Sequence, residues 1–208
     1  MVAGEFTRIV STNHGREVDL LRALNAAAAS LQKSARSEAE VYRAFRQQIT
    51  DLGMRGGLSF LDEQGETLTF SAIAQTEFES AELEKLTGVQ ANGYQIPVAM
   101  VSVCQQVVDS GEAIFVPESS DVMDQLLPEF VGRVADSVLK LLGSDPAIYA
   151  PLKTEGRVFG LMNAAGEGLT SDDVPALEAF ANHVSVALEN ARLFVALDEG
   201  QERYRNLL

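Results

Sequence analysis

Residues 148–164 read IYAPLKTEGRVFGLMNA, and this stretch decides the fold. A glycine-containing turn at 154–156 separates two apolar runs, so the sequence predicts a β-hairpin with strands over 148–152 and 157–164. The second strand carries apolar side chains on both faces, and such a strand needs cover on both sides. The sequence therefore predicts a central sheet with helices above and below it, an α+β arrangement in three layers.

Upstream of this hairpin, a second hairpin and two helices are predicted. Strands over 58–62 and 67–74 flank a short turn that contains glycine. Apolar residues at helical spacing predict helices over 17–32 and 37–52. The glycine-rich run 53–57 is expected to end the second of these helices.

A long helix is predicted from Thr170 to the last residue of the chain. Thr170 is its expected N-cap, and Asp172 and Asp173 favour the positive end of the helix dipole. Six apolar residues then recur at alternating steps of three and four, which is a heptad seam: Leu177, Phe180, Val184, Ala187, Ala191 and Phe194. We expect this seam to form a coiled-coil homodimer interface through the terminal helices. A neighbouring apolar stripe allows one stripe to pack on the chain's own domain while the other meets a partner, and a plain core helix with a frayed end is the alternative.

The composition limits the class of protein. With 208 residues, of which 46% are hydrophobic and 22% charged, the chain can build one full core. The net charge of −14 argues against nucleic acids and anionic membranes as partners, because both attract clusters of Lys and Arg. The single cysteine excludes an internal disulfide and fits a reducing compartment. Since no apolar run approaches the roughly 20 residues that span a bilayer, we expect a cytoplasmic chain that is not inserted in a membrane.

Several motifs, taken in order, resemble a GAF domain. They are GYQIP (93–97), EAIFVP (112–117), IYAPL (148–152), GRVFGLMN (156–163), LTSDDV (169–174), LEAFA (177–181) and VALENA (186–191). The resemblance covers residues 37–195 and implies a six-stranded antiparallel sheet with a ligand pocket on one face and long N- and C-terminal helices on the other. It also implies a regulatory sensor domain of a multi-domain signalling protein, such as a histidine kinase of a two-component system, with no catalysis of its own.

The resemblance suggests where a small molecule would bind. Eight residues are expected near the family's ligand pocket, although several are equally compatible with plain core: Tyr94, Met100, Cys104, Phe115, Met123, Leu126, Tyr149 and Met162. The irregular segment 119–143 is the expected lid. The sequence leaves the identity of the ligand open, and a ligand-free structural dimerisation module remains the alternative reading.

The sequence contains no clear motif for binding a cofactor or for catalysis. Cys104 is not followed by histidine, so the pattern that attaches a bilin in some GAF domains is absent, and one thiol cannot complete the cycle of the GAF sulfoxide reductases. His183 is expected at a helix boundary or interface rather than as a haem ligand, and no residues have convincing metal spacing. The Asn-Lys-Phe-Asp-Glu signature of the members that bind cyclic nucleotides cannot be assembled. An acidic pair at 172–173 is explained by helix capping, and a small enzyme is therefore the last-ranked reading.

Four segments are expected along the chain. Residues 1–16 form a disordered or vector-derived leader, 17–36 an N-terminal bundle helix and 37–195 the GAF-like domain. Residues 196–208 begin a helical connector to a downstream PAS or kinase domain, because the helical pattern stops without a C-cap. Its last seven residues, ERYRNLL, also resemble the start of a PAS domain in bacterial sensor kinases.

Overall fold

The computed structural model describes residues 20–29, 31, 36–74, 77–88, 90–126, 137 and 144–205. The predicted leader at 1–16 lies outside these residues, as do the end of the connector at 206–208 and most of the expected lid. Residues 20–29 are helical, in agreement with the predicted N-terminal helix. Within the described part of the chain, no helix is both long enough and apolar enough to cross a membrane.

A six-stranded antiparallel sheet forms the middle layer, as predicted. Its order is β3-β2-β1-β6-β5-β4, so the two hairpins lie side by side and β6 pairs with β1 at the centre. The strands are β1 (Arg55–Leu61), β2 (Thr67–Ala74), β3 (Gln95–Pro97), β4 (Ile114–Val116), β5 (Ala147–Thr154) and β6 (Arg157–Ala165). The hairpin that decides the fold is β5 and β6, and β6 is central because it is apolar on both faces.

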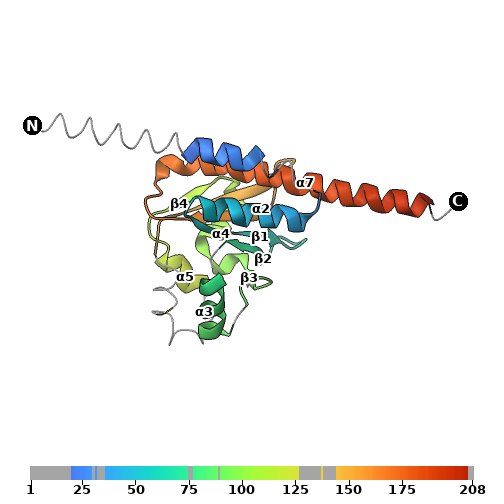
Figure 1. Cartoon of the computed structure of the whole chain (residues 1–208). Helices are drawn as coiled ribbons and strands as arrows, with labels where there is room; N and C mark the ends of the chain where they lie inside the picture. The colour runs from blue at the N-terminus through green and yellow to red at the C-terminus, as the bar shows by residue number, and fades with distance from the viewer. Residues whose placement is uncertain are drawn as a thin grey trace, which may run out of the picture.

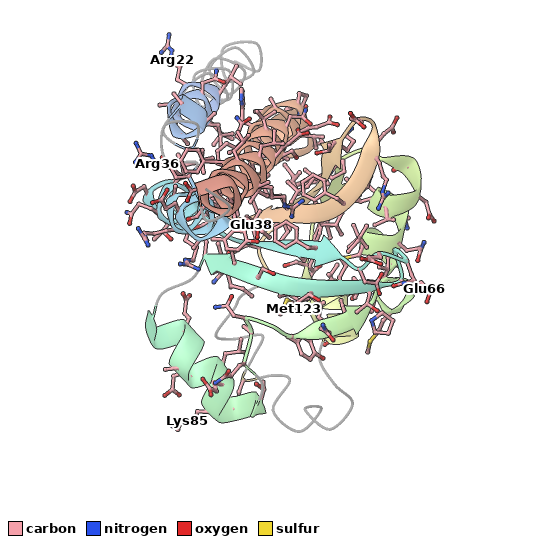
Figure 2. All side chains as sticks on the ribbon, turned by 90° about the vertical axis from the view of Figure 1, so that its right-hand side faces the viewer. Arg22, Arg36, Glu38, Glu66, Lys85 and Met123 are labelled. Carbon is pink, nitrogen blue, oxygen red and sulfur yellow. The ribbon has the colours of Figure 1, made fainter. Side chains whose placement is uncertain are left out.

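Helices cover both faces of the sheet. Helices α2 (Glu38–Asp51) and α7 (Val174–Arg205) cover one face, and α4 (Ser102–Ser110) and α5 (Ser120–Leu126) cover the other. A further helix, α3 (Glu77–Thr87), lies away from the sheet (Figure 1). Figure 1 shows the helix at 20–29 running alongside α7, and Figure 2 shows α2 and α7 together on one side of the sheet. The first hydrophobic cluster lies on this side and is centred on Phe45 of α2 and Phe180 of α7, whose rings stack with centroids 6.4 Å apart.

The opposite face of the sheet carries a second hydrophobic cluster. Successive side chains of a strand point to opposite faces, so Ile148 and Ala150 of β5 join the first cluster while Ala147 and Tyr149 join the second. Helix α4 and the buried Val122 of α5 close this second cluster. One sheet therefore supports two separate cores, and only the first contains residues of α7.

The sequence predicts that the glycine-rich run 53–57 ends a helix, but Gly56 and Gly57 lie within β1 and only Gly53 lies near the helix end. Helix α2 ends at Asp51, and Gly53 turns the chain with a positive φ of 69°. Gly56 instead lies within β1, where a Cβ atom would sit 2.3 Å from the carbonyl oxygen of Asn163 on β6. The close approach of the two central strands requires glycine at this position.

The heptad seam of α7 packs on the chain's own domain. Five of its six residues are only 0–1% exposed, and all five belong to the first cluster: Leu177, Phe180, Val184, Ala187 and Ala191. The sixth, Phe194, is 49% exposed. The seam predicted as a dimer interface is therefore mostly a core stripe, because the same spacing of apolar residues suits packing on a sheet and packing on a second helix.

Candidate functional site

The second cluster contains two polar groups that are close to each other. Cys104 of α4 is buried, and burial raises the pKa of its thiol to about 12. Tyr149 of β5 is also buried, and burial together with the neighbouring Cys104 raises the pKa of its hydroxyl. Both groups therefore stay protonated and neutral at physiological pH. A neutral thiol is a weak nucleophile, so the geometry argues for binding or packing at this position rather than covalent chemistry.

Hydrogen bonds hold the short helix α5 over the second cluster. The Tyr94 hydroxyl donates to the carbonyl oxygen of Leu126 at 3.3 Å, which ties the end of α5 to the approach to β3. The Ser102 backbone N–H donates to Gln125 Oε1 at 2.8 Å, which ties α5 to the start of α4. At the other end, the Ser119 hydroxyl donates to the carbonyl oxygen of Asp145 at 2.8 Å. Within the described residues, hydrogen bonds thus hold both ends of α5, one end to the segment before β3 and to α4, the other to the segment before β5.

The eight residues expected around a ligand pocket do not lie together. Four of them belong to the second cluster or pack against it: Tyr94, Cys104, Leu126 and Tyr149. Met123 is half-buried on α5, on the side of the sheet away from α7 (Figure 2). Met162 belongs to the first cluster and Phe115 packs against it, because strand alternation turns both to the other face, and Met100 is 43% exposed. The candidate site is therefore the four-residue group on the second face, with Met123 beside it.

A lysine at the end of β5 contacts elements on both faces of the sheet. The Lys153 ammonium donates to the carbonyl oxygen of Gly111, the C-cap of α4, at 2.9 Å, and lies 3.6 Å from a Glu178 carboxylate oxygen on α7. Its backbone N–H donates to the Ser185 hydroxyl on α7 at 3.1 Å. Sequence periodicity gives no sign of these contacts, since Lys153 and Gly111 are 42 positions apart.

A second polar contact marks the point where α7 leaves the domain. The Arg192 guanidinium pairs with the Glu38 carboxylate of α2 at 2.6 Å and lies 5.3 Å from the centre of the Phe159 ring. The Phe159 ring stacks on Phe60, which contacts Tyr42. Arg192 follows directly after Ala191, the last buried residue of α7 among those described. The cluster of Tyr42, Phe60, Phe159, Arg192 and Glu38, here called the exit cluster, is the last anchor of α7 on the domain.

The acidic pair at the start of α7 has a structural role. The Asp173 carboxylate accepts from the backbone N–H of Thr170 at 2.8 Å and from its hydroxyl at 3.1 Å, and the backbone N–H of Asp173 donates to the carbonyl oxygen of Thr170 at 3.1 Å. This agrees with the prediction for Asp173, whose carboxylate serves the start of the helix. Among the described residues, no group of three His, Cys, Asp or Glu side chains is arranged to hold a metal ion.

Solved structures share this fold. A GAF domain from a phosphoenolpyruvate-protein phosphotransferase of Coxiella burnetii has a TM-score of 0.61 at 11% identity, covering 86% of this chain and 98% of that one. Free methionine-R-sulfoxide reductase from Neisseria meningitidis has a TM-score of 0.60 at 15% identity, covering 86% of this chain and 93% of that one. A fragment of a methyl-accepting chemotaxis protein has a TM-score of 0.58 at 19% identity, covering 80% of this chain and 97% of that one. At these identities the likeness is one of fold.

The sequence itself provides the assignment to a family. No curated protein matches it significantly. The family model described as GAF domain matches residues 35–189, which is most of the chain. The chain therefore belongs to the GAF domain family, whose members are regulatory or sensory domains found in signalling proteins.

Proposed function

We propose that this GAF domain is the sensor module of a larger signal-transduction protein, a cytoplasmic part of a histidine kinase, and that α7 carries its output. The observation that supports this most strongly is the shape of α7. It is one continuous helix of 32 residues, which corresponds to about 48 Å. Its first half packs on the sheet and its second half extends beyond the domain (Figure 1). A rigid rod that is fixed in one domain and projects from it is suited to transmit a rotation or shift to whatever follows.

The proposed input is a small molecule that binds at the second cluster, near Cys104 and Tyr149. These two groups are neutral and the residues around them are apolar, so this part of the site favours an uncharged ligand. A ligand would act only if it bound one arrangement of the domain more tightly than another. The end of α5 and the start of α4 are the elements that such a ligand would reposition, because one hydrogen bond joins them and a second joins the end of α5 to Tyr94 on this face.

The proposed partner is a second copy of the chain, which meets α7 through a stripe other than the predicted seam. Val186, Leu193 and Leu197 are 45%, 58% and 68% exposed, and their spacing of seven and four places them on one side of the helix. Asn190 is exposed and falls between them at the position where a heptad often carries a polar residue that fixes register. Two such stripes in parallel would continue into the connector.

Substitutions on two sides of α7 test the dimer. Leu193→Glu should weaken dimerisation by about tenfold or more, because it removes a leucine that the proposed interface would bury and places like charges opposite each other. Val195→Glu is the matched control, since Val195 is an exposed apolar residue of the same helix that points away from Leu193. Sedimentation equilibrium of both variants measures the dissociation constants. Equal weakening by both substitutions, or no dimer in the unmodified chain, would contradict the proposed interface.

A ligand-free dimerisation module is the second candidate function. It is favoured by the filled second cluster, in which side chains such as Val101, Val107 and Leu161 are almost fully buried. Native mass spectrometry of the purified chain separates the two functions. A dimer that carries a stoichiometric added mass would support the sensor, whereas a dimer of bare protein would support the structural module.

A further inference from the structure

The side chain of Lys153 joins α4, which packs on the second cluster, to α7, the proposed output helix. Lys153 is on β5, at the point where the pairing of β5 with β6 shifts between Leu152 and Lys153. An irregularity of this kind turns a side chain away from the regular alternation of the strand. The ammonium group can therefore reach α4 and α7, although these helices cover opposite faces of the sheet.

The contact with α4 is made at the end of the helix. Gly111 is the C-cap of α4, with a left-handed φ of 67°, and its backbone N–H donates to the carbonyl oxygen of Val107. The Lys153 ammonium, which can only donate hydrogen bonds, donates one to the Gly111 carbonyl oxygen at 2.9 Å. A cation at this end of a helix interacts favourably with the helix dipole and with the last carbonyl groups. The position of the end of α4 is therefore linked to the position of Lys153.

The contact with α7 is made twice. The Lys153 ammonium lies 3.6 Å from Glu178 Oε1, and both side chains are partly buried. The backbone N–H of Lys153 donates to the hydroxyl of Ser185, which is 2% exposed and in turn donates to the carbonyl oxygen of Ala181 at 2.9 Å. Glu178 and Ser185 are seven residues apart, so they lie on one side of α7 and fix two successive turns of it to the end of β5.

We propose that Lys153 is a positioning residue for signalling, which couples movement of α4 to movement of α7. This inference rests on the proposed sensor function, since coupling across the sheet matters only if α4 responds to a ligand and α7 carries the output. Movement of the end of α4 toward or away from the sheet changes the distance from Gly111 to the Lys153 ammonium. The ammonium group then either moves with Gly111 and draws Glu178 and α7 with it, or loses its contact with Glu178. Because coupling is reciprocal, a disturbance at Glu178 must also be felt at α4.

Cys104 is a built-in reporter of α4. It is the only cysteine of the chain and lies on the buried side of α4, so a thiol reagent such as DTNB reacts with it only when α4 opens. In the full chain, Glu178→Gln should raise the rate of Cys104 labelling by about three- to tenfold, which is the range expected for loss of one charge-assisted contact. Lys153→Met should raise it at least as much. The double variant should label no faster than Lys153→Met alone, because Glu178 acts on α4 through Lys153.

Two controls make the experiment specific. Arg192→Gln also removes an ion pair of α7, the one with Glu38, but has no contact with Lys153, so it should leave the labelling rate unchanged. Lys153→Arg keeps a cation that can donate to both partners and should restore slow labelling. The global unfolding constant of each variant is measured in parallel, and the expected rates exceed those that global unfolding alone would give.

Three results would overturn the inference. The first is an equal effect of Glu178→Gln in the presence and absence of Lys153. The second is an effect of Arg192→Gln as large as that of Glu178→Gln. The third is a rate of Cys104 labelling that is proportional to the global unfolding constant in every variant. Cys104 would then react only when the whole domain unfolds, and α4 would not open by itself. None of these measurements needs a ligand, a dimer or a downstream domain, so a failure here is distinct from a failure of the proposed function.

Discussion

The two halves of α7 belong to one helix but have different surroundings. Up to Ala191, an apolar stripe of the helix is buried against the sheet and α2, whereas from Arg192 to Asp198 every residue is exposed. The heptad seam continues across this boundary to Phe194, yet the surface that it packs on ends there. A periodic pattern therefore indicates that a helix has an apolar side, and the length of the surface beside it determines how much of that side is buried.

The largest expected effect compares two phenylalanines of the same seam. Phe180→Ala should lower the free energy of unfolding by about 3–5 kcal/mol, because it leaves a cavity beside Phe45. Phe194→Ala should change the stability of the monomer by no more than about 0.5 kcal/mol, because the ring is half exposed. Urea denaturation at low protein concentration measures both. Similar losses for the two variants would mean that the second half of α7 is packed as firmly as the first.

A smaller effect is expected at the boundary between the halves. Arg192→Gln removes an exposed ion pair with Glu38 and the contact with the Phe159 ring, so the loss of stability should stay below about 1 kcal/mol. Amide hydrogen exchange should nevertheless become faster in the turns of α7 around position 192, which lose their last anchor. Lys85→Gln removes another exposed pair, with Glu82 on α3, and should not alter exchange in α7. If the exchange rates of α7 are the same in both variants, the exit cluster does not anchor the helix.

The smallest expected effect is a shift in the pKa of a tyrosine of the exit cluster. Burial, and then the negative charge of Glu38, raise the pKa of the Tyr42 hydroxyl from 10.0 to about 12, while Arg192 lowers it. Arg192→Gln should therefore raise the pKa of Tyr42 further. The folded chain holds this proton more tightly than the unfolded chain, so stability is full below pH 10 and is lost as the pH rises toward 12.

Absorbance titration at 295 nm of the unmodified chain, with Tyr42→Phe as the reference that identifies the signal of Tyr42, measures this pKa. The same titration with Arg192→Gln gives the shift. A lower pKa of Tyr42 in the Arg192→Gln variant would show that the Arg192 guanidinium does not lie close to the Tyr42 hydroxyl in solution.

Part of the candidate site could be predicted from the sequence and part could not. The family resemblance predicts that Tyr94, Cys104, Leu126 and Tyr149 lie together, and all four lie in or against the second cluster. The resemblance predicts the same place for Met162, but strand alternation turns this residue to the other face. The strand sequence alone does not encode which of its faces meets which helices. The sequence does not predict the contacts of Lys153, since no local pattern relates a lysine to a carbonyl group 42 residues away.

The sequence by itself determined the features that depend on neighbouring residues. Turn residues and apolar alternation predicted both long hairpins, and the cap formed by Thr170 and Asp173 marked the start of α7. Only the tertiary structure decided which stripe of α7 is buried, that Gly56 must admit the backbone of β6, and that Lys153 reaches both faces of the sheet. The physical reason is range: turns and caps are satisfied within a few residues, whereas packing and long-range hydrogen bonds depend on which segments the folded chain brings together.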